Sequence, residues 1–162
     1  MTSSPPLHHQ QTIVVHVPAE ELYDLVSDVT RTGEWSPICR ECWWEDGAQP
    51  GTVGAWFGGR NQTPDRTWET RSKVVAASRG REFAWLVGGR YSRWGFTLEH
   101  SDEGTYLTES WDFLPEGIEF FHEKYGDDAE AQIADRSRAA LSGVPETLAA
   151  IKRIAEEGSA AR

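Results

Sequence analysis

The middle of this chain is a succession of short strand-like segments, and a single long amphipathic segment follows it. Between Ile38 and Phe113, turn signals recur at roughly 8- to 13-residue intervals, the spacing expected of an antiparallel meander. Residues 129–157 instead repeat apolar side chains at helical spacing along one face. Both the sheet and the helix then have one apolar face to bury, so we expect the long helix to pack on the sheet.

Shorter elements precede the meander. Residues 11–17 form a β-rich run, and Pro18 then begins a helix of about two turns. A second short turn follows, which Gly33 and Pro37 bring to an end. The order is therefore strand, two short helices, about six further strands and a long helix. This order predicts an α+β fold, because βαβ units would alternate the two kinds of element.

The region after the last strand contains two further signals. Residues 115–128 are acidic and predict a loop that joins the last strand to the long helix. Two roles are open for this loop and its His122: gating the mouth of a cavity, with His122 as a ligand-binding residue, or packing on the rim of the sheet, which is the more common case. Pro145 has no amide hydrogen to donate, so we expect it to kink the long helix or divide it in two.

Length and charge restrict the domain organisation and the partners. At 162 residues the chain fits one domain, expected at residues 11–157 between disordered tails at residues 1–10 and 158–162. A net charge of -10 without a cluster of Lys and Arg argues against nucleic acid as a partner. No apolar run approaches the ~20 residues that span a bilayer. We therefore expect a cytoplasmic protein without a membrane partner; a homodimer is left open.

Strand alternation assigns one face of each strand to the interior. The charged side chains Glu69, Arg71 and Lys73 must face water, which turns the alternate set of their strand inward. The same test on the other strands gives a concave aromatic wall with a few polar groups, which favour a cavity over a filled core. The residues expected to bind a ligand there are Trp35, Phe57, Asn61, Trp68, Thr70, Ser72, Trp85, Trp94, Phe96, Trp111 and His122.

Glu109 lies two residues from both Leu107 and Trp111 in the last strand, so it faces inward with them. A buried carboxylate costs several kcal/mol unless it is paired or solvated. Glu109 therefore needs Arg136 or Arg138 of the long helix as a partner, a water-filled cavity, or a raised pKa that keeps it protonated. A β-bulge would instead turn it to solvent. The cavity and the raised pKa both make Glu109 a candidate catalytic acid or base.

Cys39 and Cys42 have the C-x-x-C spacing of a redox pair or of half a zinc site. Their flanks are strand-like, and residues three apart in a regular strand point to opposite faces. With no other cysteine, a zinc site would need histidines that are scattered along the chain. We therefore expect two reduced cysteines packed in or near the core, with no metal and no cofactor.

Short motifs follow the predicted elements in order. They are Gly33-Glu34-Trp35-Ser36-Pro37, Phe57-x-Gly59-x-Asn61, Trp68-x-Thr70, Phe83-x-Trp85, Trp94-x-Phe96-x-Leu98 and the segment 104–111 (GTYLTESW). Together they resemble the polyketide cyclase/dehydrase-like branch of the START/Bet v 1-like (SRPBCC) superfamily, from about Thr12 to Glu157. The resemblance implies a helix-grip fold, in which a curved seven-stranded antiparallel sheet surrounds a long C-terminal helix with a ligand cavity between them.

The resemblance leaves two functions open, because this superfamily contains both enzymes and binding proteins. One is a cofactor-independent cyclase or dehydratase of polyketide type, in which Glu109 moves a proton while Asn61, Thr70 or Ser72 polarises a carbonyl. The other is a non-catalytic binding or carrier protein for a hydrophobic metabolite or lipid. In both cases the partner is a small, apolar or polyketide-like ligand. A protein-interaction domain would instead expose an apolar face, against which the charged outward residues argue.

Overall fold

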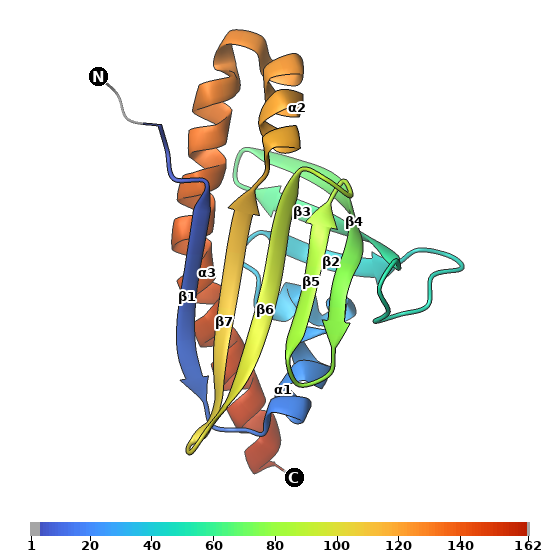
Figure 1. Cartoon of the computed structure of the whole chain (residues 1–162), viewed down its shortest axis with the longest axis vertical. Coiled ribbons are helices and arrows are strands. Elements are labelled where there is room, and N and C mark those ends of the chain that lie inside the picture. The colour runs from blue at the N-terminus through green and yellow to red at the C-terminus, as the bar shows by residue number, and fades with distance from the viewer. Residues whose placement is uncertain (1–3, 162) are drawn as a thin grey trace.

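The computed structural model describes residues 4–161. Its elements are β1 (His8–Val15), α1 (Ala19–Val26), η1 (Val29–Glu34), β2 (Cys39–Trp44), β3 (Trp56–Thr63), β4 (Arg66–Ser78), β5 (Glu82–Val87), β6 (Ser92–Ser101), β7 (Gly104–Phe113), α2 (Pro115–Tyr125), η2 (Gly126–Asp128) and α3 (Ala129–Ala160). The strands form one antiparallel sheet in the order β1-β7-β6-β5-β4-β3-β2 (Figure 1). The predicted α+β architecture is confirmed.

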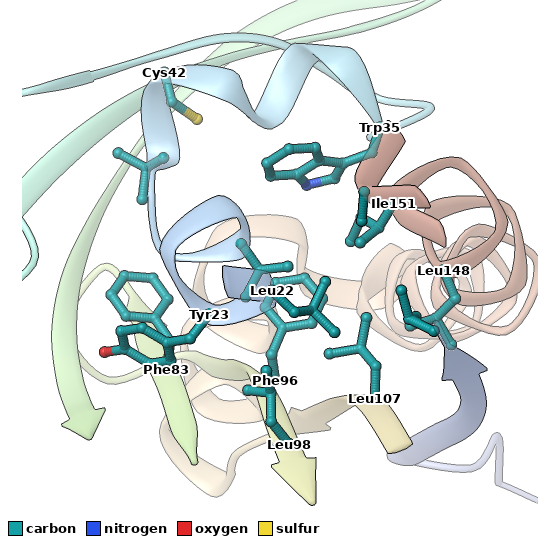
Figure 2. Packing of buried hydrophobic residues seen from close by; sticks show 14 of the residues in the cluster. Leu22, Tyr23, Trp35, Cys42, Phe83, Phe96, Leu98, Leu107, Leu148 and Ile151 are labelled. Carbon is teal, nitrogen blue, oxygen red and sulfur yellow. The ribbon is translucent and has the colours of Figure 1, made fainter. Parts of the chain in front are cut away.

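The long helix α3 supplies the apolar face that covers the sheet. It runs alongside β1 and β7, whereas α1 lies at the end of the sheet where α3 ends (Figure 1). Leu148 and Ile151 of α3 are fully buried and belong to the same cluster as Phe96 and Leu107 of the sheet (Figure 2). Each such side chain contributes about 1.5–3 kcal/mol by leaving water, so this interface contributes substantially to stability.

The first and last strands pair along their whole length, from His8 opposite Asp112 to Val15 opposite Thr105. The next strand, β2, lies at the opposite edge of the sheet, so α1 and η1 carry the chain from one edge to the other. The β6–β7 turn lies so close to β1 that a Cβ on Gly104 would fall 2.3 Å from the Val15 carbonyl oxygen. The φ of Gly104 is also +144°, so both space and conformation require glycine there.

The sheet register confirms the predicted inward set. Pairing between β6 and β7 is unbroken and places Glu109 opposite Phe96, which excludes the bulge that would have turned Glu109 to solvent. Register shifts occur elsewhere, in β4 after Val74 and in β2 between Cys39 and Glu41.

Both ends of the chain are more ordered than predicted. The expected tail at residues 1–10 includes residues 8–10, which are part of β1, while residues 1–3 lie outside the described residues. Polar residues can form this edge strand because its backbone pairs with β7 and the His9 ring stacks on Trp111 at 5.6 Å. The predicted tail from residue 158 is also wrong up to Ala160, because α3 continues to that residue.

Two expectations about the C-terminal third are wrong. Residues 115–125 form α2 rather than a loop, because Pro115 occupies the first turn and Phe121 and Ile118 pack on the core cluster of Trp111 and Phe113. Pro145 neither breaks nor divides α3. It lies on the exposed side of the helix, where water can hydrate the carbonyl that loses its partner, while Val144 and Leu148 are buried on the other side.

Replacing Pro145 with alanine should therefore stabilise the protein. An interior proline costs about 3 kcal/mol or more in a helix, and about 0.4–1 kcal/mol of this is offset because proline also restricts the unfolded chain. We expect a gain of about 1–3 kcal/mol in urea unfolding, against a change within about 0.5 kcal/mol for Glu146→Ala on the same exposed turn. A loss of stability in Pro145→Ala would contradict this explanation of the uninterrupted helix.

Candidate functional site

Glu109 is the one charged residue among the buried polar side chains of the described chain. It lies in the middle of β7, its relative exposure is 4%, and its neighbours on the same face are Leu107 and Trp111. Strand β7 places Glu109 there because alternation along an unbroken register leaves its side chain no other direction. An acidic group therefore lies between the sheet and α3.

The predicted ion pair between Glu109 and the long helix is absent from the described residues. Arg136 instead bonds Asp135 at 2.9 Å and lies over the Phe121 ring at 5.4 Å from its centroid. Arg138 is largely exposed, and its nearest carboxylate is also that of Asp135, at 4.0 Å. Of the alternatives for Glu109, pairing with an arginine is thus wrong.

The electrostatics of Glu109 follow from burial alone. Its Oε2 atom is buried and has no hydrogen-bond partner within residues 4–161. Desolvation raises the pKa of the Glu109 carboxyl to about 8, because the charged form loses its hydration and gains no compensating cation. At neutral pH the protonated acid is therefore the main form, and it can donate a proton or a hydrogen bond.

The aromatic side chains around Glu109 belong to two clusters. The larger one includes Phe57, Phe96 and Leu107, and the smaller one includes Trp111 and Phe113. Trp94 packs against both clusters, and its ring centroid lies 6.4 Å from that of Trp111. Along α3, the change from one cluster to the other falls within a single turn, between Ala140 and Val144. Glu109 thus lies on the inner face between Leu107 of the larger cluster and Trp111 of the smaller one.

A second polar group lies on the adjoining strands β3 and β4. The Asn61 side-chain amide donates to the Thr70 hydroxyl oxygen at 3.3 Å, which leaves the Thr70 hydroxyl hydrogen free to donate. Ser72, two residues along the same face, has a relative exposure of 3%. Strands β5 and β6 separate this group from β7, and the register places Glu109 level with Ala77 of β4, seven residues along that strand from Thr70. Thr70 and Glu109 therefore lie well apart on the sheet.

Most of the predicted ligand-binding residues share the inner face, but their burial differs. Trp35, Phe57, Phe96 and Trp111 are buried, and Trp85 connects Phe57 with Phe96 through ring contacts of 6.1 and 6.0 Å. Five others point inward yet keep partial exposure: Asn61, Trp68, Thr70, Trp85 and Trp94. The inner face is therefore not sealed along β3 to β6.

His122 does not belong to this set. It lies on the exposed side of α2, and Phe121, its neighbour, makes the inward contact with Phe113 at 5.0 Å between ring centroids. The loop predicted around His122 is a helix, and helical spacing of Ile118, Phe121 and Tyr125 is the signal that would have identified it.

Two arginines lie over aromatic rings at the α2 end, a placement that sequence reasoning did not predict. Arg66 lies over the Trp68 ring at 4.0 Å, and Arg136 lies over the Phe121 ring. Burial, together with the charge of Arg66, lowers the pKa of the Arg136 guanidinium. This effect places Arg66 of the β3–β4 hairpin near Arg136 of α3 at this end of the inner face.

One surface hollow lies elsewhere on the described chain. It encloses about 940 Å³ at the opposite end of the sheet, open to solvent, and is lined by residues 16–20, 79–81 and 98–104. None of the predicted ligand-binding residues lines it, and Glu109 lies outside it. Its walls are turns with charges of both signs, so we regard the inner face around Glu109 as the better candidate site.

The fold and its inner face define an α+β helix-grip protein. The chain belongs to the family described as polyketide cyclase/dehydrase and lipid transport, whose sequence model matches residues 6–149. No curated protein matches the chain. Among the described residues, none of the helices has both the length and the apolar character needed to cross a membrane.

Solved structures agree with this assignment. The chain is 50% identical to the Polyketide_cyc-like protein Cgl2372 from Corynebacterium glutamicum, with a TM-score of 0.68, covering 93% of this chain and 91% of that one. It also matches the di-domain ARO/CYC proteins StfQ of the steffimycin pathway (TM-score 0.70, 16% identity, 95% and 52% covered) and BexL of the BE-7585A pathway (0.67, 18%, 92% and 50%). At these identities the two di-domain proteins show the fold alone, and the chain spans about half of each.

The raised pKa of Glu109 makes stability depend on pH in a defined direction. A carboxyl whose pKa is higher in the folded state stabilises the fold below its unfolded value of 4.5, and this contribution is lost as pH rises toward about 8. Glu109→Gln should remove that dependence, so its stability relative to the native chain should rise with pH across this window, by up to about 1.4 kcal/mol per pH unit. Urea unfolding at pH 5, 6.5 and 8 measures the difference.

Glu99→Gln provides the matched control, because Glu99 is an exposed carboxyl on the outward face of the neighbouring strand. Its difference from the native chain should stay constant over the same pH range. Parallel curves for Glu109→Gln and the native chain would show that Glu109 is solvated or paired after all.

Proposed function

We propose that this protein binds a small, largely apolar metabolite between the sheet and α3, and that it acts as a cofactor-independent cyclase or dehydratase of polyketide type. One observation carries the proposal: Glu109 is buried without a partner in the middle of an aromatic inner face. A buried carboxyl with no structural partner costs stability, and such a cost is typical of functional sites. Membership of the polyketide cyclase/dehydrase family supports the same reaction class.

A protonated Glu109 suits the dehydration of an aldol. Its proton moves to the hydroxyl of the substrate, the carbon–oxygen bond breaks, and water leaves. The Glu109 carboxylate then removes a proton from the neighbouring carbon, and that electron pair forms the new double bond. The carboxyl ends protonated as it began, so the net change is the loss of one water and no further reagent is required.

The Asn61–Thr70 pair would hold the other end of such a ligand. Because Asn61 occupies the Thr70 oxygen, the Thr70 hydroxyl hydrogen is available to a carbonyl of the ligand. Thr70 and Glu109 are separated by two strands and by several residues along the strand direction, so a ligand that reaches both must be an extended chain such as an oligoketone rather than a single small acid. The aromatic rings between them would exclude water and orient the chain.

A non-catalytic carrier is the second candidate, because the family description also covers lipid transport. In a carrier, the protonated Glu109 would donate a hydrogen bond to the ligand and no bond would break. The ligand class is the same, so only turnover separates the two functions. We also propose a cytoplasmic location, which suits the two free cysteines. Homodimerisation remains a prediction, which a measurement of the molecular mass in solution would test.

Glu109→Gln should abolish most turnover while preserving the shape of the site. A placed acid or base contributes roughly 10²- to 10⁴-fold, so the rate of dehydration of a synthetic β-hydroxyketone chain should fall by at least about 100-fold. Product is followed by mass spectrometry and binding by tryptophan fluorescence in the same samples, with Glu99→Gln as the control. Native-like turnover in Glu109→Gln would refute the catalytic role, and binding without turnover in the native chain would favour the carrier.

Thr70→Val should weaken binding without removing turnover. Loss of one neutral hydrogen bond costs about 0.5–1.5 kcal/mol, which corresponds to a roughly 2- to 12-fold weaker affinity. Thr97→Val is the matched control, because Thr97 is exposed on the outward face of β6. Equal affinities for both variants would remove the Asn61–Thr70 pair from the proposed site.

A further inference from the structure

The two cysteines of β2 lie side by side, although residues three apart in a regular strand point to opposite faces. The register shift between Cys39 and Glu41 explains the difference. Cys39 pairs with Asn61 and Cys42 with Gly59, so the four residues 39–42 of β2 face only the three residues 59–61 of β3. Both sulfur atoms therefore reach the same face, and they lie 3.1 Å apart. The expectation that they diverge is wrong.

Two glycines leave room for this arrangement. A Cβ on Gly59 would lie 3.3 Å from the Cys42 sulfur and 3.7 Å from the Cys39 sulfur. A Cβ on Gly33 would fall 2.3 Å from the carbonyl oxygen of Arg40, the residue at the register shift. The η1 segment thus packs directly against the bulge, and β3 opens a space beneath the two sulfurs. The thiol pair is held in place by contacts on both sides.

The two sulfurs are chemically unequal. The hydrogen bond from Cys42, with help from the charge of Arg40, lowers the pKa of the Cys39 thiol. The same hydrogen bond, together with burial, raises the pKa of the Cys42 thiol. Cys39 is therefore the better nucleophile, and Cys42 holds the proton next to it.

The pair is buried but lies close to the polar part of the inner face. Cys39 is 9% exposed and Cys42 is 8% exposed, and Figure 2 shows Cys42 at the border of the core cluster. The Thr70 hydroxyl lies 3.4 Å from the position of a Cβ on Gly59, and both Thr70 and Asn61 keep partial exposure. The low exposure of both sulfurs favours reaction with a small reagent such as hydrogen peroxide over reaction with a protein reductant.

We propose that Cys39 and Cys42 are a redox-active dithiol, which hydrogen peroxide converts into an intramolecular disulfide. The Cys39 thiolate attacks one peroxide oxygen, the oxygen–oxygen bond breaks, and the released hydroxide takes up a proton to give water. The Cys42 sulfur then attacks the sulfenic acid of Cys39 and displaces the hydroxyl, which leaves as a second water with the Cys42 proton. Two thiols are oxidised by two electrons, and one peroxide is reduced to two waters.

The experiment treats the purified full chain with hydrogen peroxide and then blocks free thiols with an alkylating reagent. Intact-mass spectrometry should show a loss of 2 Da and no alkylation in the monomer, and a small dithiol reductant should restore both free thiols. The proposal is independent of ligand binding, so a failure of the catalytic role of Glu109 leaves it unaffected.

Single-cysteine variants test the unequal roles. Cys42→Ser should accumulate a sulfenic acid at Cys39 that dimedone traps, whereas Cys39→Ser should react with peroxide at least ten-fold more slowly. Circular dichroism verifies that both variants are folded, and the native chain unfolded in urea serves as the reference for unconstrained thiols. The proposal is overturned if the disulfide forms only in urea, if it forms only between two chains, or if Cys39→Ser reacts as fast as Cys42→Ser.

Discussion

The contact between α3 and the inner face of the sheet is the interaction on which the rest of the structure depends. Neither element can exist alone in water, because each presents a continuous apolar surface to the other. Leu148 and Ile151 enter the same cluster as Phe83 and Leu107, which joins the C-terminal helix to the middle of the sheet. The pairing of β1 with β7 then places the first strand beside this helix.

Polar side chains within this apolar interface indicate a functional role, because burying them there reduces stability. Apolar burial drives the contact, so a carboxyl placed in the middle of it reduces stability. Glu109 meets no cation there, because Arg136 binds Asp135 and stacks on Phe121 instead. The protein lowers the cost by keeping the carboxyl protonated rather than by pairing it. A group held in that state can exchange a proton with a ligand, whereas a salt-bridged carboxylate could not.

Sequence reasoning was sufficient where a regular period applied. The inward parity of Glu109 followed from charged residues that had to face water, and the structure confirms it because β6 and β7 pair without interruption. Sequence reasoning failed where the local structure depends on packing between several segments. Helix α2 was predicted as a loop from its acidic residues although Ile118, Phe121 and Tyr125 have helical spacing, and the residues its apolar face packs on, Trp111 and Phe113, come from another segment. The bulge in β2 was missed because Gly33 and Gly59, which accommodate it, come from two other segments.

The sequence by itself determined which side chains point into this protein, since the two-residue period of a strand and the need to hydrate charges leave little choice. Only the tertiary structure decided what those side chains meet. Whether Glu109 has a partner depends on the direction taken by an arginine on a helix far along the chain. Whether Cys39 and Cys42 touch depends on one extra residue in a strand. Local periodicity contains neither fact, because both arise from packing between segments that are distant in the sequence.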